Sequence, residues 1–431
     1  MMKYTEYDMN AYKLHIINTD KFKTITVGVA FRRKIVKEEI TIRNLLKEIM
    51  INSTRNYPTE KSLIEATENL YDLKLSAFNY RVGNYTITAF RTRFLNEKYT
   101  EDGMNSESIR FFLDLIFNPK LDNDVDKCKK KLEKSIISLK DNKIKYTISK
   151  LLETTGNMPY AYNGYGYLDD IDKINVKDIE EYYNSVIKDD IIDVYVVGQV
   201  EDDKIKELFK EYFKVMTYHK DNIDLITGEL NNNKKVLEYR ENDNVNQTQL
   251  AILCNLKGLT DKERKYVLPV YSAMLGGSAN SILFDAVREK NSYAYYVNSL
   301  VKSYDNILII YAGIGKGNEK NVYKIIVNTL NGIKKGRFPD DKFNSAKETI
   351  TTAIKASLDN PMDIITNYYA RVLVGSPSEE ERIININKVS REDIVNVSKK
   401  ISLHTMFILE DNDEEDNDKE DRWRYLLWKV R

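Results

Sequence analysis

The sequence predicts an α+β fold built from two homologous domains, each a mostly antiparallel sheet with helices packed on one face. Within each half, strand-like runs come first and helical patterns follow, which is the order typical of this class. The same order of elements occurs twice along the chain. Corresponding points lie roughly 210–220 residues apart, a spacing that is too long for a solenoid repeat and indicates a duplicated domain.

The first half alternates between two kinds of apolar pattern. Runs with strand-like alternation or continuous apolar character predict strands at 12–17, 24–31, 73–80, 85–94 and 192–197. Apolar residues at helical spacing predict helices over 42–50, 58–70, 106–117, 124–139, 144–152, 176–186 and 203–213. Pro58 stands at the start of the second of these helices, where its fixed φ suits the first turn.

The second half repeats this order. Strands are expected over 248–256, 295–301, 307–314 and 405–409, the middle two as a hairpin. Helices are expected over 263–275, 281–290, 318–334, 339–358, 362–374 and 391–400. The two halves also share short sequence motifs. Leu139-Lys-Asp-Asn and Leu358-Asp-Asn each follow a long predicted helix that contains lysines.

An Asn- and Lys-rich stretch without strong periodicity separates the halves. Such a composition is typical of a linker. The sequence therefore predicts an N-terminal domain over 1–215, a linker over 216–235 and a C-terminal domain over 236–431.

The composition is that of an ordinary soluble protein. Lysine plus arginine and aspartate plus glutamate number 66 each, so the formal net charge is zero. No general attraction to nucleic acid or to an anionic membrane is expected. The two cysteines, Cys128 and Cys254, lie far apart and predict neither a disulfide framework nor a zinc knuckle. No stretch of about 18 apolar residues occurs, so no membrane span is expected. Free thiols fit a reducing compartment, and the N-terminus has no apolar core like that of a signal peptide, so we expect a cytoplasmic protein. The acidic stretch 410–421 is expected to be a solvated loop.

The most informative segment runs from Leu283 to Tyr295, Leu-Phe-Asp-Ala-Val-Arg-Glu-Lys-Asn-Ser-Tyr-Ala-Tyr. It follows a Leu-Gly-Gly-Ser turn at 275–278 and precedes an extended apolar stretch. The turn lacks the Gly-Lys-Ser/Thr ending of a phosphate loop, so we expect its glycines to allow close helix packing. Within the segment, Arg288 and Tyr295 stand seven positions apart.

This segment and the duplicated plan resemble the pitrilysin/insulinase zinc peptidases, in particular their two-domain members. The N-terminal sequence from Lys13 to Thr24 is similar to the corresponding sequence in a bacterial branch of the family described as inactive metalloproteases. The resemblance implies a His-x-x-Glu-His motif on the first helix, in which two histidines bind zinc and the glutamate is the general base. Counting back from Tyr57-Pro58, the motif positions hold Asn44, Lys47 and Glu48. These residues cannot reproduce the zinc site, so neither a metal nor another cofactor nor a catalytic residue is predicted.

The histidines offer no substitute for this motif. His15, His219 and His404 are the only ones, and no two are close in sequence. We interpret His15 as a structural histidine in a strand. With so few histidines, no Ser-His-Asp or Cys-His arrangement can be argued.

The second group of functional residues in this family, an arginine and a tyrosine seven positions apart, has counterparts in this sequence. In active relatives, an arginine and a tyrosine at this spacing contact the bound peptide, which implies substrate binding by Arg288 and Tyr295. A guanidinium donates paired hydrogen bonds, and a phenol can stabilise an oxyanion. The alternative is an exposed helical arginine and a tyrosine packed on the sheet. Relatives often carry Gly-Leu where this chain has Ser292-Tyr293. This difference affects the geometry of the turn and therefore the direction in which the Arg288 side chain points.

Two functions follow from this resemblance. The first is a zinc-less subunit of a heterodimeric metallopeptidase, inactive alone, that supplies substrate-binding residues to a homologous zinc-bearing partner acting on peptides. The second is a structural or peptide-binding member with no role in proteolysis. Fold alone cannot decide between them.

Overall fold

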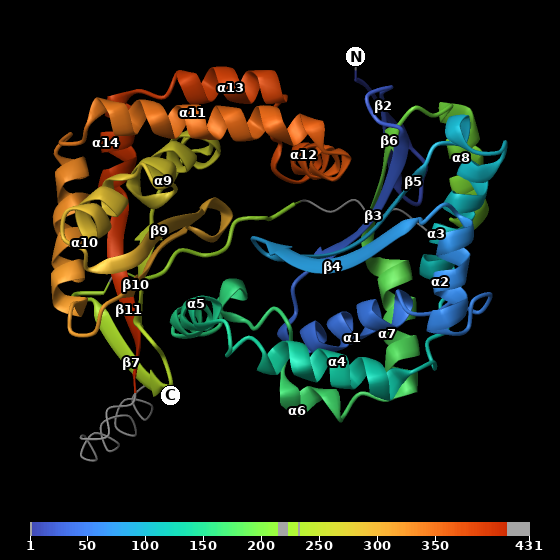
Figure 1. Ribbon diagram of the computed structural model, residues 1–431, viewed down its shortest axis with the longest axis horizontal. Helices are drawn as coiled ribbons and strands as arrows, with labels where there is room; N and C mark the ends of the chain where they lie inside the picture. The colour runs from blue at the N-terminus through green and yellow to red at the C-terminus, as the bar shows by residue number, and fades with distance from the viewer. Residues whose placement is uncertain (1, 214–222, 232, 412–431) are drawn as a thin grey trace.

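The computed structural model describes residues 2–213, 223–231 and 233–411. These residues contain two sheets, one from each half of the chain (Figure 1). The first sheet has the order β1-β2-β6-β3-β5-β4, with β1 Lys3–Asp8, β2 Lys13–Asn18, β3 Thr24–Lys34, β4 Lys74–Val82, β5 Tyr85–Leu95 and β6 Ile191–Gly198. The second has the order β7-β11-β8-β10-β9, with β7 Leu237–Asp243, β8 Thr248–Leu256, β9 Ala294–Lys302, β10 Ile307–Ile314 and β11 Ile401–Asp411.

Both sheets are mostly antiparallel, as predicted. Among the described residues, each contains one parallel pair, β2 with β6 and β7 with β11, and the other strand pairs are antiparallel. The α+β class with two similar units is therefore confirmed. The strands β1 and β7 were not predicted. Their sequences, KYTEYD and LEYREND, are polar because both are edge strands with largely exposed residues.

One face of each sheet is covered by helices of its own half. The first half contributes α1 Ile40–Met50, α2 Glu60–Asn69, α3 Met104–Phe117, α4 Val125–Ile137, α6 Leu168–Ile171, α7 Val176–Asp189 and α8 Asp202–Tyr212. The second contributes α9 Leu268–Gly276, α10 Glu319–Lys334, α11 Asp340–Ala356, α13 Glu379–Asn387 and α14 Arg391–Lys399, with helical turns at 263–267 and 284–289. Each layer closes over its own apolar core.

The opposite faces are covered by an exchange of helices between the halves (Figure 1). The first half sends α5 Lys143–Glu153 onto the second sheet, where Leu151 packs in a cluster with Leu253 of β8. The second half sends α12 Pro361–Val374 onto the first sheet, where Ile365 packs in a cluster with Tyr195 of β6. The sequence predicted both helices but not their exchange, because a helical pattern does not reveal which sheet it covers. Each half therefore completes the core of the other.

The segment 223–231 also joins the halves. The amide of Asn84 in the β4–β5 turn donates to Leu225 O at 3.0 Å, and the amide of Thr227 donates to Tyr304 O at 2.9 Å. Gly83 (φ +53°) lets Leu225 O approach so closely that a Cβ there would lie 1.7 Å from it. Residues 214 and 215 at the end of the predicted N-terminal domain, and residues 216–222 and 232 of the predicted linker, lie outside the described residues, so the boundaries at 215 and 236 stay predictions.

Candidate functional site

The helix α1 carries the three positions where the family motif would stand. Its apolar face, which includes Leu45 and Ile49, is buried in the first core. On another face, Asn44 is only 5% exposed, and its Nδ2 donates to Ile40 O and to Gly164 O, each at 2.9 Å. Its Oδ1 accepts from Asn79 Nδ2 of β4 at 3.0 Å. The Asn44 amide is therefore engaged with protein groups on both of its atoms.

The other two motif positions form an ion-pair cluster. Lys47 Nζ lies 2.6 Å from one oxygen of Glu48, and Lys131 Nζ of α4 lies 2.7 Å from the other. Burial alone would raise the pKa of Glu48, but hydrogen bonds from Lys131 and Lys47 outweigh it and hold that pKa below its usual value. The carboxylate is thus ionised and already neutralised by two cations.

These residues do not fit a zinc ion. An amide is a poor ligand, and the nearest carboxylate lies between two ammonium groups that repel a dication. Across 2–213, 223–231 and 233–411, no cluster of three His, Cys, Asp or Glu side chains could hold a metal.

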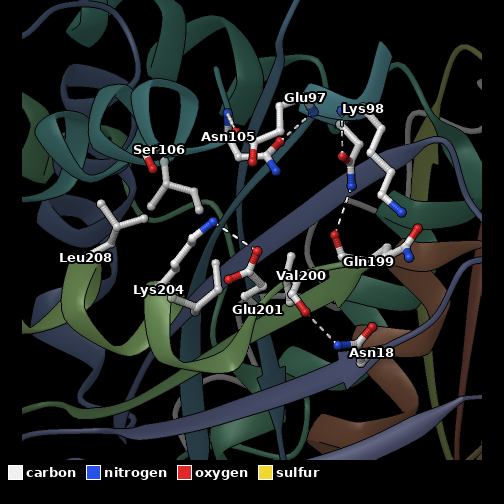
Figure 2. A pocket seen from close by; sticks show the side chains of 13 residues that line it. Asn18, Glu97, Lys98, Asn105, Ser106, Gln199, Val200, Glu201, Lys204 and Leu208 are labelled. Atoms are coloured by element: carbon white, nitrogen blue, oxygen red, sulfur yellow. Dashed lines mark hydrogen bonds and ion pairs between the residues drawn. The ribbon is translucent and has the colours of Figure 1, made fainter. Parts of the chain in front are cut away.

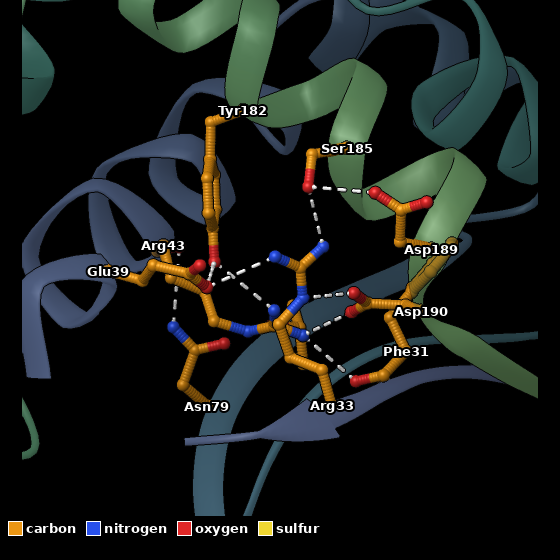
Figure 3. A network of polar contacts seen from close by, with 10 residues as sticks. Phe31, Arg33, Glu39, Arg43, Asn79, Tyr182, Ser185, Asp189 and Asp190 are labelled. Carbon is orange, nitrogen blue, oxygen red and sulfur yellow. Dashed lines mark hydrogen bonds and ion pairs between the residues drawn. The ribbon is translucent and has the colours of Figure 1, made fainter. Parts of the chain in front are cut away.

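A buried polar network lies next to these positions and anchors α1 to the sheet (Figure 3). Arg43, which is 3% exposed, donates to Asp190 Oδ2 at 2.7 Å, to Thr88 Oγ1 at 2.7 Å and to Phe31 O at 3.0 Å. Arg33 also binds Asp190, so this carboxylate pairs with two guanidinium groups. Sequence reasoning missed the network, because these residues come from four separate elements or their ends, namely α1, β3, β5 and α7.

A pocket of about 90 Å³ opens where α1 meets the edge strand β4. It is lined by Ile35, Val36, Glu39, Ile40, Arg43, Asn44, Asn79, Tyr80, Arg81, Thr86, Tyr162 and Gly164. The degenerate zinc position therefore borders both a pocket and an unpaired strand edge.

Arg288 and Tyr295 lie in a very different environment. The side chain of Arg288, in the helical turn 284–289, is 47% exposed and packs over the Phe284 ring at 4.8 Å. Its Nε lies 3.9 Å from Glu289 Oε1, a loose ion pair. Tyr295, the second residue of β9, is 68% exposed. Within the described ranges, no group forms a hydrogen bond with the Tyr295 hydroxyl. Both side chains are therefore free to contact another molecule.

A tight turn brings these two residues to the same end of β9. The amide of Tyr293 donates to Val287 O at 3.0 Å, and Ser292 adopts φ +52°. Ser292 therefore has a left-handed backbone conformation, which glycine adopts most easily. Glycine is also the residue that the resemblance leads us to expect at this position. In the ladder with β10, Tyr296 faces Gly313 and Ala294 faces Ile314, so Tyr295 is the extra residue of a bulge. A bulge re-aims a side chain, which accounts for the exposure of Tyr295.

The Leu-Gly-Gly-Ser turn serves packing, as expected. A Cβ on Gly276, at the end of α9, would lie 2.8 Å from Ser299 N of β9. Because Gly276 has no side chain, α9 can pack directly against the edge strand β9, the strand that also carries Tyr295.

The histidines play structural parts where they are described. His15 is fully buried, its Nδ1 lies 2.9 Å from Tyr4 Oη, and its ring stacks on Tyr195 at 4.4 Å. His404 lies in β11 and contacts Thr405 Oγ1 at 2.7 Å. His219 lies outside the described residues.

A second pocket, of about 340 Å³, lies between the loops at 96–106 and 199–201 (Figure 2). Several of its polar groups bind each other: Asn18 Nδ2 donates to Val200 O at 2.7 Å, Asn96 Nδ2 to Gln199 O at 2.9 Å, and Lys204 pairs with Glu201 at 2.9 Å. These contacts hold the loops together, and we assign no chemistry to this pocket.

The duplicated sheets, the degenerate helix and the exposed Arg288 and Tyr295 resemble the arrangement of M16-like peptidases, without a zinc site among the described residues. Residues 173–350 match the family described as the peptidase M16 inactive domain. The chain is 29% identical to the probable inactive metalloprotease YmfF of Bacillus subtilis over 416 residues, covering 93% of this chain and 96% of that protein. It is 26% identical over 258 residues to the uncharacterized zinc protease YmxG of the same organism, covering 58% of this chain and 60% of that protein.

Solved structures share the fold along nearly the whole chain. A conserved protein from Enterococcus faecalis superposes with a TM-score of 0.88 at 24% identity, covering 96% of this chain and 100% of that one. A peptidase M16 inactive domain from Pseudomonas fluorescens gives 0.78 at 13% identity, covering 95% and 98%. The chain is therefore similar to M16-like peptidases, among them members described as inactive, and the predicted resemblance is confirmed.

Proposed function

We propose that this chain is the zinc-less subunit of a heterodimeric metallopeptidase. A homologous partner supplies the zinc and the general base, and this chain supplies Arg288 and Tyr295 to the bound peptide. The observation that carries the proposal is the contrast between the two half-sites. The zinc position is closed by internal pairing, whereas Arg288 and Tyr295 are exposed and free of strong internal partners.

The chemistry of the two free side chains suits a peptide. A guanidinium can donate paired hydrogen bonds to a peptide carbonyl, and a phenol can donate to an oxyanion that forms during cleavage. The edge strands β4 and β9 add backbone groups that an extended peptide can pair with. Because the part of the chain that the structure describes offers no zinc site, these contacts assist cleavage only when a partner supplies the metal.

The relatives support a pairing of this kind. Bacillus subtilis encodes both a probable inactive metalloprotease and a zinc protease that are similar to this chain. In a cytoplasmic complex of two such homologues, the zinc-bearing subunit would supply the metal and the zinc-less subunit would supply substrate-binding residues.

The test is co-expression of the full chain with zinc-bearing homologues from its own genome, followed by purification and a peptide-cleavage assay. We expect a stable complex that cleaves peptides and loses activity when its zinc is chelated. The partner alone should be much less active. If no zinc-bearing homologue co-purifies, or if the partner alone is as active as the complex, the proposal is wrong and the structural or peptide-binding alternative is preferred.

A further inference from the structure

A groove of about 830 Å³ runs between α2 and α3 on the first half of the chain. Its lining includes Ala66 of α2, Phe111 of α3 and Tyr212 of α8, which give it a partly apolar and aromatic character. Among the described residues, it shares no lining residue with the pocket next to the degenerate zinc position, and neither Arg288 nor Tyr295 lines it. The groove is therefore separate from both half-sites.

Acidic side chains dominate the charged part of this groove. Its lining has one basic residue, Arg110, and four acidic residues, Glu65, Asp102, Glu107 and Asp114. Arg110 is already paired, since its Nε lies 3.5 Å from Glu211 Oε2. Glu65 forms a loose pair with Lys61 at 3.6 Å, whereas Asp102 and Glu107 have no ion pair within the part of the chain that the structure describes. The groove therefore presents negative charge that the chain itself does not neutralise.

Asp114 brings this negative charge into the buried part of the groove. It lies on α3 and is only 8% exposed. Its Oδ1 accepts hydrogen bonds from Asn56 Nδ2 at 3.0 Å and from Asn118 Nδ2 at 2.9 Å. Its Oδ2 is buried, and no described residue donates a hydrogen bond to it. A buried carboxylate oxygen without a donor is unfavourable, so this position favours a ligand that brings a guanidinium or an ammonium group.

A segment of the same sequence matches the groove in both charge and apolar character. Residues 422–431 read Arg-Trp-Arg-Tyr-Leu-Leu-Trp-Lys-Val-Arg and lie outside the described residues. The segment contains arginines and a lysine but no acidic residue, and its remaining side chains are aromatic or aliphatic. Guanidinium groups complement carboxylates, and aromatic rings complement the apolar lining. The segment is therefore a suitable occupant of the groove.

The place where the described chain ends indicates that the occupant comes from another molecule. The strand β11 ends at Asp411 beside β7, at the left end of the long axis in Figure 1, whereas α2 and α3 lie at the right end. A compact chain of this length is about 55–60 Å across, but the stretch from Asp411 to Arg422 spans at most about 40 Å. The segment of one chain therefore does not reach the groove of the same chain.

We infer that the groove between α2 and α3 binds residues 422–431 of a second copy of this chain. The arginines of the segment pair with Glu107 and Asp114, and its aromatic side chains pack against Phe111 and Tyr212. Such a contact joins two different surfaces, so it links copies head to tail. The inference is independent of peptide cleavage and goes beyond the proposed function.

Tryptophan fluorescence of the full chain tests this contact. Trp423 and Trp428 are the only tryptophans in the sequence, so the emission reports on the segment alone. We expect the emission to shift to shorter wavelength and acrylamide quenching to fall as the protein concentration rises. Analytical ultracentrifugation should show self-association over the same concentration range, and added salt should weaken it.

Charge-removing variants assign the contact to its two surfaces. Glu107→Gln with Asp114→Asn removes the groove charges, and the new amide oxygen at 114 can still accept from the neighbouring asparagines. Arg422→Gln with Arg424→Gln removes two charges from the segment. Each double variant alone should associate about 10-fold or more weakly than wild type, the range for losing a charged hydrogen bond. Glu107→Gln alone, an exposed position, should give a smaller loss in the same direction.

Mixing the two double variants distinguishes this contact from other kinds of association. The groove variant keeps an intact segment and the segment variant keeps an intact groove, so the mixture should regain association that neither has alone. Glu133→Gln, which changes an exposed acidic residue of α4 outside the groove, is the matched control and should associate like wild type. Tryptophan emission that does not depend on concentration, whether buried or solvent-exposed, would overturn the inference. Unchanged association in the groove variant, or no recovery on mixing, would overturn it as well.

Discussion

The helix α1 and the segment 284–295 hold the residues that correspond to the two half-sites of the M16-like peptidases that this chain resembles, and they differ in how their polar groups are used. On α1, Asn44 is buried, Glu48 is partly buried, and both are paired with groups of the same chain. By contrast, Arg288 of the turn 284–289 and Tyr295 of β9 are exposed to solvent, and Arg288 has only a loose ion pair with its neighbour.

This difference separates structural from functional polar residues. A buried, paired group contributes to stability, and its loss leaves its partners unsatisfied. An exposed group without strong partners contributes little to stability and is available to another molecule. Substitutions in the two regions should therefore have opposite effects on stability and on peptide cleavage.

The largest expected effect is on stability, from Arg43→Ala. This change leaves Asp190 with one guanidinium and leaves Phe31 O and Thr88 without their donor. Breaking a buried pair in this way costs about 3–5 kcal/mol of unfolding free energy. Urea denaturation measures it, with Arg288→Ala as the control that should lie within about 0.5 kcal/mol of wild type. An Arg43→Ala protein as stable as wild type would remove the structural role of the α1 network.

The second effect is on cleavage, from Arg288→Ala in the assembled complex. Loss of a charge-assisted hydrogen bond to substrate costs about 1.5–3 kcal/mol, which is roughly a 10- to 150-fold drop in kcat/KM. Tyr295→Phe removes only the hydroxyl and should give a smaller drop. Both variants should assemble with the partner normally. Wild-type kinetics for both would refute the shared site, and the structural alternative would then be preferred.

A third effect links stability to pH through Glu48. Glu48→Gln removes the charge that joins Lys47 and Lys131 and should lower stability at pH 7 by about 1–2 kcal/mol. The pKa of Glu48 lies below its usual 4.5, so this stabilisation is complete above pH 4.5 and disappears as the pH falls through the lowered value. Thermal unfolding of wild type and variant should therefore converge under acidic conditions. A constant difference between them down to pH 2 would contradict the ion-pair account.

A smaller effect is expected at the turn before Tyr295. Ser292 has φ +52°, a conformation that costs a residue with a Cβ about 1 kcal/mol. Ser292→Gly should raise the unfolding free energy by about 0.5 kcal/mol, because glycine's larger entropy in the unfolded chain offsets part of the gain. Ser292→Val should lower it, and equal stability of both variants would show that the turn is not strained.

The smallest expected effect is that of a zinc chelator, which should leave the stability of the protein unchanged. Asn44, Lys47 and Glu48 do not form a zinc site, so purified, tag-free protein should carry no stoichiometric zinc. Elemental analysis measures this, and a chelator should leave the melting temperature unchanged. One tightly held zinc per chain would contradict our interpretation of α1.

Much of the fold could be predicted because most elements bury one apolar face. The alternating run of β3 and the helical spacing in α1 and α10 record that burial locally in the sequence. The strands β1 and β7 were missed because an edge strand can be polar on both faces and still complete a ladder through its backbone. The exchange of α5 and α12 was missed because an apolar helix face does not identify the sheet that it covers.

The sequence by itself determined that the zinc motif is absent and that Arg288 and Tyr295 stand at their family spacing, since both depend only on residue type and order. Tertiary structure alone decided that Lys131 neutralises Glu48 and that Tyr295 projects from a bulge. The physical reason is that these properties depend on which distant segments pack together, and on which polar groups remain unpaired afterwards.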